Sequence, residues 1–150
     1  MEAIREGFAA AQLPGRFDRR GRWIFDVAHN PAGVEVLLSA LAAARPSRPL
    51  HALVGILADK EWASMVRSLA AAVDGLWVTD PPSAPPERRW DLDTVGPSVR
   101  RSVGPPIVVE KDFDTALRDV QHGAGTVLVT GSFHTVGDAM ARLPGFAPLG

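Results

Sequence analysis

The side chains best suited to chemistry stand where apolar segments end. Asp26-Val27-Ala28-His29-Asn30-Pro31 places a carboxylate, an imidazole and an amide within one short turn, and Thr130-Gly131-Ser132 ends another apolar run. Arg16 follows Pro14-Gly15, and a guanidinium presents a fixed fork of donors that suits phosphate oxygens. Ser132 precedes a segment of helical period, where unpaired N–H groups of the helix attract an anion. These residues indicate a binding site for an anionic ligand.

Each of these residues also has a structural interpretation. Arg16, taken alone, is more often a solvated surface arginine, and Asp26 can cap the helix that begins at Pro31. His29 alone is more often a structural histidine, whereas its place in the turn suits contact with phosphates or an amino acid. Asn30 is at least as well explained as a helix N-cap as by ligand contact.

Other polar residues at segment ends leave alternatives open. Asp59 and Lys60 either pair with each other, or Lys60 faces a substrate. Arg88 and Arg89 are either solvated or line the cleft. The group Ser132, His134 and Asp138 invites a hydrolase interpretation, which we reject because no Gly-x-Ser-x-Gly elbow is present.

The elements that must position these residues follow an alternating strand and helix pattern. Short β-branched runs alternate with segments of helical period, which predicts βαβ units. We expect an α/β three-layer sandwich, with a mostly parallel, Rossmann-like sheet of about six strands and helices on both faces. Residues near Arg16 to Asp18 form an antiparallel edge strand, paired around Arg19-Arg20-Gly21-Arg22. The other expected strands are 23–26, 50–57, 76–79, 107–109 and 126–130, and the expected helices are 31–44, 60–73, 91–101, 113–121 and 133–143.

Pro81-Pro82-Ser83-Ala84-Pro85-Pro86 is too proline-rich for a helix or a central strand, so we expect a long loop there. Because open α/β sheets bind ligands at the carboxyl ends of their strands, Arg16, Asp26, His29 and Ser132 should share one rim.

Length and composition bound the classes of function. The 150 residues predict a single domain, 1–150, with residues 1–12 as a linker or leading helix. With 16 basic and 17 acidic residues, the net charge of −1 gives no field to attract nucleic acid or an anionic membrane. The absence of cysteine excludes a disulfide framework and a thiol nucleophile, and favours a cytoplasmic location. No apolar run approaches the roughly 18 residues of a membrane span.

Four motifs together carry a resemblance to a known family. They are Leu13-Pro14-Gly15-Arg16, Asp26-x-Ala28-His29-Asn30-Pro31, Asp59-Lys60-Glu61 and Thr130-Gly131-Ser132. In this order and spacing the chain resembles the C-terminal domain of the folylpolyglutamate synthase/dihydrofolate synthase family, within the Mur ligase superfamily. The resemblance covers nearly all of the chain, and the Asp-x-Ala-His-Asn-Pro hexapeptide is its specific part.

The resemblance implies an ATP-dependent amide ligase. In such an enzyme ATP phosphorylates a folate-type carboxylate, and the amine of glutamate attacks the acyl phosphate. It also implies an N-terminal partner domain, in the same or a separate chain, that holds the phosphate loop, Mg²⁺ and most of the folate site. This chain has no Gly-x-x-x-x-Gly-Lys-[Ser/Thr], so we expect it to be inactive alone.

The resemblance further implies roles for particular residues. Arg16, Asp26 and His29 would contact the nucleotide, and His29 would also be catalytic. Ser132, Lys60 and Asn30 would bind the amino-acid substrate, and no residue is expected to bind a metal. Two departures are Val27, where the family often has glycine, and Glu61, where it usually has aspartate.

The alternative is a free-standing, non-catalytic nucleotide- or amino-acid-binding module of the same fold. A dinucleotide-binding dehydrogenase or a methyltransferase is disfavoured because Gly-x-Gly-x-x-Gly follows no strand.

Overall fold

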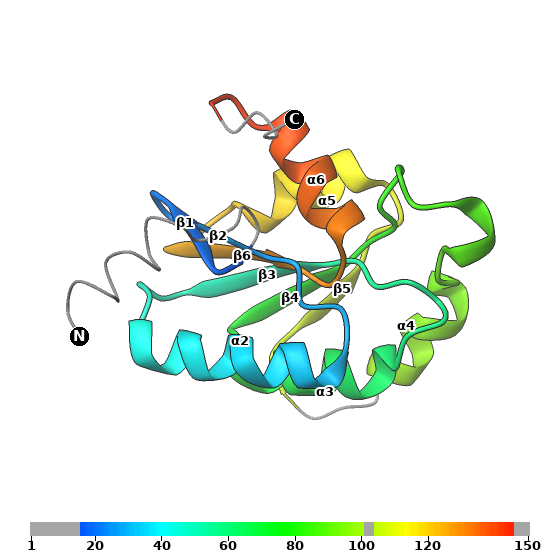
Figure 1. Ribbon diagram of the computed structural model, residues 1–150, viewed down its shortest axis with the longest axis horizontal. Coiled ribbons are helices and arrows are strands. Elements are labelled where there is room, and N and C mark those ends of the chain that lie inside the picture. Colours follow the sequence, from blue (N-terminus) through cyan, green and yellow to red (C-terminus); the bar gives the residue numbers. More distant parts are fainter. Residues whose placement is uncertain (1–15, 101–103, 146–150) are drawn as a thin grey trace.

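The computed structural model describes residues 16–100 and 104–145. These residues form one sheet with helices on both faces (Figure 1). The strands are β1 (Asp18–Arg20), β2 (Trp23–Asp26), β3 (Leu50–Val54), β4 (Gly75–Val78), β5 (Ile107–Val109) and β6 (Thr126–Thr130). The helices are α2 (Pro31–Ala44), α3 (Trp62–Ala72), the single 3-10 turn η1 (Pro86–Arg88), α4 (Leu92–Arg100), α5 (Phe113–Val120) and α6 (Phe133–Arg142).

The strands lie in the order β1-β2-β6-β3-β4-β5. Each neighbouring pair is parallel except β1 with β2, which is antiparallel. The predicted α/β sandwich, with a mostly parallel sheet of about six strands and an antiparallel edge strand, is confirmed. The last strand in sequence, β6, lies between β2 and β3, an order that the sequence analysis did not predict.

The sheet separates two apolar cores, because successive residues of a strand point to opposite faces. Ile24, Ala52 and Leu128 pack on the side of α2, α3 and α4. Phe25 and Val129 pack on the side of α5 and α6. Figure 1 shows α2 and α3 below the sheet and α5 and α6 above it.

The first hairpin differs from the prediction. The edge strand lies at Asp18–Arg20 instead of 16–18, and its register with β2 leaves only Gly21 and Arg22 in the turn. Gly21 has a φ of 62°, which a glycine adopts without steric cost. The charged run 19–22 therefore belongs partly to a strand, which is possible because edge strands tolerate charged side chains.

Strand β3 is shorter than the predicted 50–57 and ends at Val54. The N–H of Gly55 still donates to the Thr130 carbonyl at 3.3 Å, after which the chain leaves the sheet. Leu57 then makes an isolated antiparallel bridge with Arg89. Ile56 is part of the core on the α2 side, and Leu57 is buried where it bridges to the segment after β4, so their apolar character reflects burial and not strand pairing.

The proline-rich segment is a loop, as predicted, but η1 follows directly and was missed. Proline suits the start of such a turn because its fixed φ is helical and its absent N–H would be unpaired there. The bounds of the other predicted elements differ from the observed ones by two residues or fewer. The predicted segment 1–12 and position 101, where the helix predicted at 91–101 was expected to end, lie outside the described residues. Within the described residues, no helix is both long and apolar enough to cross a membrane.

Candidate functional site

The strand order places a topological switch point between β2 and β6. These neighbouring parallel strands are followed by helices on opposite faces of the sheet, α2 after β2 and α6 after β6. Chains that diverge in this way leave a crevice outside the carboxyl ends of the strands, which is where open α/β sheets bind ligands. The structure brings His29 to one side of this crevice and Ser132 to the other, although they are far apart in sequence.

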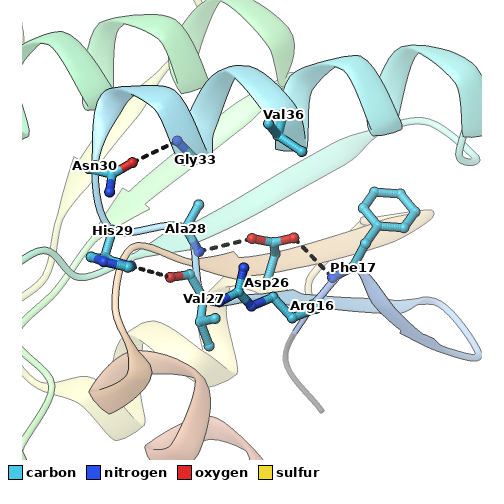
Figure 2. A pocket seen from close by; sticks show the side chains of 9 residues that line it. All are labelled: Arg16, Phe17, Asp26, Val27, Ala28, His29, Asn30, Gly33 and Val36. Carbon is cyan, nitrogen blue, oxygen red and sulfur yellow. Dashed lines mark hydrogen bonds between the residues drawn. The ribbon is translucent and has the colours of Figure 1, made fainter. Parts of the chain in front are cut away.

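A pocket of about 340 Å³ opens beside the end of β2 (Figure 2). We call it the Asp26 pocket; it is lined by Arg16, Phe17, Asp26, Val27, Ala28, His29, Asn30, Gly33 and Val36. Its walls come from the two residues before β1, from the end of β2 and the turn after it, and from the first turns of α2. All three residues predicted to contact a nucleotide, Arg16, Asp26 and His29, line this one pocket.

The Asp26 carboxylate joins two backbone segments. One oxygen accepts the N–H of Phe17 at 2.9 Å, and the other accepts the N–H of Ala28 at 2.9 Å. Burial raises the pKa of Asp26, while the two N–H bonds and the charge of Arg16 oppose that rise. The interpretation of Asp26 as the cap of α2 is wrong, because its partners lie outside that helix.

Asn30 is the N-cap of α2. Its side-chain oxygen accepts the N–H of Gly33 at 2.7 Å, and Pro31 occupies the first helical position. The structural interpretation of Asn30 is therefore correct for this oxygen. Asn30 lines the Asp26 pocket and is absent from the lining of the second pocket, described next.

A second pocket of about 140 Å³ lies across the switch point. We call it the Ser132 pocket; it is lined by His29, Leu57, Lys60, Arg88, Ser132, Phe133 and His134. These residues follow β2, β3, β4 and β6, which shows how the parallel sheet gathers distant segments. Lys60 and Arg88 bring two cationic side chains to the pocket, and Arg88 is paired with the Asp59 carboxylate.

His29 is the residue that the two pockets share. Its Nδ1 lies 3.1 Å from the Val27 carbonyl, which can only accept, so Nδ1 carries a hydrogen. Nε2 is then the nitrogen that remains for a ligand. The ring also lies near Phe133, at 6.0 Å between centroids, so the first residue of α6 flanks the imidazole.

Arg88, and not Lys60, is the ion-pair partner of Asp59. The Arg88 guanidinium donates to the Asp59 carboxylate at 3.1 Å, and this hydrogen bond lowers the pKa of Asp59. Lys60 lines the pocket, which favours the second of its two interpretations. Arg89 donates to the carbonyls of Ala84 and Pro82, so it holds the proline-rich loop and does not line either pocket.

Ser132 is buried and caps α6. Its hydroxyl oxygen accepts the N–H of Thr135 at 3.1 Å and lies 2.9 Å from the Thr135 hydroxyl. The preceding Gly131 has a φ of 114°, and a Cβ there would lie 2.5 Å from the Gly55 carbonyl oxygen. The turns after β3 and β6 thus cross in direct backbone contact, which only glycine at position 131 permits.

The family model that describes the Mur ligase, glutamate ligase domain matches residues 15–133 of this chain. The chain belongs to this family. Its resemblance to the C-terminal domain of the folylpolyglutamate synthase/dihydrofolate synthase family is confirmed.

Named relatives support this assignment of the Mur ligase domain. The dihydrofolate synthase/folylpolyglutamate synthase of Escherichia coli K12 is 37% identical over 143 residues, which cover 92% of this chain and 32% of that protein. The structure of E. coli FolC in complex with DHPP and ADP has a TM-score of 0.77 and 32% identity, over 93% of this chain and 33% of that one. A bifunctional folylpolyglutamate synthase/dihydrofolate synthase with Mn, AMPPNP and L-glutamate bound has a TM-score of 0.72 and 34% identity, over 93% and 34%. The Mur ligase domain thus spans about a third of the length of these relatives.

Three residues that line the second pocket of the Mur ligase domain, Leu57, Phe133 and His134, were not predicted as ligand contacts. Phe133 and His134 follow Ser132 directly, so their position after Thr130-Gly131-Ser132 was the available signal. His134 Nδ1 lies 3.2 Å from the Ser83 hydroxyl, and Asp138 accepts the Ser83 N–H at 3.0 Å. Ser132 pairs with Thr135 instead, so these contacts do not form the hydrolase triad that we had rejected.

The described part of the Mur ligase domain contains no cluster of side chains arranged as metal ligands. No group of three or more His, Cys, Asp or Glu side chains is placed to hold a metal ion among the described residues.

Proposed function

We propose that this chain is the C-terminal, ATP- and amino-acid-contacting domain of an ATP-dependent folate (poly)glutamate ligase. The observation that carries the proposal is the pair of adjoining pockets at the switch point, with His29 in both. One pocket holds Arg16, whose guanidinium suits phosphate oxygens, and the other holds Lys60 and Arg88, whose positive charges suit a dicarboxylic amino acid. Relatives with ADP, AMPPNP or L-glutamate bound support the same assignment.

The Asp26 pocket would take the nucleotide. Arg16 supplies a charge-assisted contact to phosphate, and Asp26 supplies acceptors for hydroxyl groups such as those of ribose. Each Asp26 oxygen already accepts one backbone N–H, and each retains a further lone pair. The backbone bonds hold the carboxylate in place, so a ligand hydroxyl would meet an acceptor that is already oriented.

The Ser132 pocket would take glutamate. Lys60 and Arg88 are its cations, and the start of α6 adds N–H groups that have no acceptor within the helix. The ion pair with Asp59 fixes the position of the Arg88 guanidinium, and the Asp59 carboxylate offsets part of the positive charge of Arg88. Asn30 was predicted for this subsite, but its place in the other pocket favours a role beside the nucleotide.

The reaction would join the two pockets. The carboxylate of a folate-type acid takes the γ-phosphoryl group of ATP, giving ADP and an acyl phosphate. The glutamate amine then attacks the acyl carbon, the amide bond forms, and phosphate leaves with the bonding electrons. His29 lies between the pockets and would orient the amine toward the acyl phosphate.

A second domain would be needed for catalysis. The sequence has no lysine-containing phosphate loop, and phosphoryl transfer depends on positioning and on neutralising the phosphates. Mg²⁺, which would supply part of that neutralisation, is assigned to the domain that carries this loop. The folate-type acid would bind mostly there as well, and a cytoplasmic location remains a prediction.

Kinetics with a supplied partner domain test this proposal. The chain is fused to, or mixed with, the phosphate-loop domain of a folylpolyglutamate synthase, and ATP and glutamate are varied separately. Arg16→Ala should raise the ATP requirement about ten- to hundredfold, because a charge-assisted contact to phosphate is lost. His29→Ala should lower turnover more than either affinity, and Ser132→Ala should raise the requirement for glutamate.

The matched control is Arg118→Ala on α5, whose exposed guanidinium pairs with its neighbour Asp119 and lines neither pocket. Its kinetics should equal those of the wild type. Amide formation by the 150-residue chain alone would contradict the need for a second domain. Wild-type kinetics in all three pocket variants would show that neither pocket serves the reaction.

A further inference from the structure

The hydroxyl groups of Ser132 and Thr135 form a chain whose direction can be deduced. The Thr135 hydroxyl lies 2.8 Å from the Gly55 carbonyl oxygen, which can only accept a hydrogen bond. Because a hydroxyl has one hydrogen, the Thr135 hydroxyl donates that hydrogen to the Gly55 carbonyl oxygen and has none left to donate to Ser132. The 2.9 Å contact between the two hydroxyls therefore has Ser132 as donor and Thr135 as acceptor.

This direction decides what Ser132 can offer to a ligand. Its hydrogen goes to Thr135, and one of its lone pairs accepts the Thr135 N–H at 3.1 Å. One lone pair remains on the oxygen, and Ser132 is a lining residue of the Ser132 pocket. Ser132 is only 2% exposed, and turning its hydroxyl hydrogen into the pocket would break a buried hydrogen bond. Ser132 thus meets a ligand as an acceptor, which suits an N–H and repels a carboxylate oxygen.

We propose that Thr135 is a positioning residue that fixes the Ser132 hydroxyl as an acceptor for the amine of the amino-acid substrate. This inference rests on the proposed function and adds the orientation of the substrate. The carboxylates then lie toward Lys60 and Arg88, and the amine lies toward the turn that Ser132 shares with α6. His29 lines the same pocket and borders the nucleotide pocket, so the amine end faces the place where the acyl phosphate would form.

Binding of two small acids to the 150-residue chain tests the orientation. L-Glutamate and glutarate carry the same two carboxylates, and glutarate lacks the amine. Calorimetric titration of the wild type should show glutamate binding about tenfold more tightly, the effect of one hydrogen bond to a neutral acceptor. Ser132→Ala should abolish this preference while leaving glutarate binding within about twofold.

Thr135 variants separate positioning from simple support of the fold. Thr135→Val keeps the shape but removes the acceptor for the Ser132 hydrogen, so Ser132 becomes free to donate to a carboxylate. The preference for glutamate should then fall below about threefold, largely through tighter binding of glutarate. Thr135→Ser retains the hydroxyl and should retain the wild-type preference.

The outcomes distinguish this inference from the proposed function. Equal binding of glutamate and glutarate by the wild type, or an unchanged preference in Thr135→Val, would overturn the orientation and leave the amino-acid pocket in place. Failure of both acids to bind the wild type would overturn the pocket and the orientation together.

A measurement without ligand covers the case in which Thr135→Val does not fold. Nuclear Overhauser contacts of the two buried hydroxyl protons in the wild-type chain report where each proton points. The Ser132 proton should lie near the Thr135 oxygen, and the Thr135 proton should point toward Gly55. The reverse arrangement, with the Thr135 proton directed at Ser132, would overturn the proposal.

Discussion

Asp26 and Thr130 are direct partners in the parallel register of β2 and β6. Both lie two residues after core residues of the α2 side, Ile24 and Leu128, so both side chains project to that face. Asp26 accepts two backbone N–H groups, whereas the buried Thr130 hydroxyl has no hydrogen-bond partner among the described residues. On this face of the switch point, the Asp26 carboxylate therefore has hydrogen-bond partners and the neighbouring Thr130 hydroxyl has none among the described residues.

Asp26 should make the stability of the chain depend on pH. Burial raises its pKa above the ordinary 3.8, so the folded state binds a proton more tightly than the unfolded state. The free energy of unfolding should therefore fall as pH rises from the ordinary pKa through the raised one, and then level off. Asp26→Asn does not titrate, so this slope should be missing.

Chemical denaturation of both proteins from about pH 3 to about pH 8 measures the effect as a difference between them. Other carboxylates contribute equally to the two curves and cancel. A difference that grows with rising pH would mean that the ionised carboxylate is stabilised in the folded state, contrary to this prediction.

Thr130→Val should stabilise the chain by about 1 kcal/mol. The substitution keeps the shape of the side chain and removes a buried hydroxyl that has no partner. Urea denaturation gives the difference in free energy of unfolding, provided that the dependence of this free energy on urea concentration is the same in both proteins.

Thr126→Val, on the same strand, is the matched control. The Thr126 hydroxyl donates to the Ser47 carbonyl at 2.8 Å, so its removal should cost about 1 kcal/mol. A loss in Thr130→Val as large as that in Thr126→Val would show that the Thr130 hydroxyl is bonded after all.

Gly131→Ala should destabilise the chain by about 3 kcal/mol or more. The residue has a φ of 114°, and the new Cβ would lie 2.5 Å from the Gly55 carbonyl oxygen, which is backbone and cannot move aside easily. Gly137→Ala in α6 has nothing within 4 Å of the new Cβ and should stabilise by about 0.5–1 kcal/mol. Thermal unfolding of the two variants should therefore shift in opposite directions, and shifts of the same sign would refute the close crossing.

Asp138→Ala should loosen the proline-rich loop. The buried Asp138 carboxylate accepts the Ser83 N–H, and its removal leaves that donor unpaired at a cost of about 1–3 kcal/mol. Hydrogen exchange of the Ser83 amide should become faster. The control, Asp93→Ala, removes an exposed ion pair with Lys111 and should change stability by less than about 0.5 kcal/mol. Unchanged Ser83 exchange in Asp138→Ala would show that other contacts hold the loop.

Much of the fold was predictable because its signals are local. The helix from Pro31 to Ala44 was predicted with its observed bounds, since proline at the first position and the apolar period mark it within one segment. Strand β6, at Thr126–Thr130, was likewise predicted because it is a continuous run of buried residues that are β-branched except for Leu128. Errors arose where apolar character came from distant contacts, as at Ile56, which is part of the core on the α2 side, and at Leu57, which bridges to Arg89.

The sequence by itself determined most of the elements, the parallel class of the sheet and the turn that joins Asp26 to His29, because these depend on residues close together in the chain. Tertiary structure decided that β6 lies between β2 and β3, which sets Ser132 across the crevice from His29. It also decided that Asp59 pairs with Arg88. Strand order and hydrogen-bond direction depend on which distant backbone groups meet, and no short stretch of sequence carries that information. The Gly55 carbonyl accepts the hydrogen of the Thr135 hydroxyl, so the Ser132 hydroxyl must donate to Thr135. The contact between Gly55 and Thr135 forms only in the folded chain.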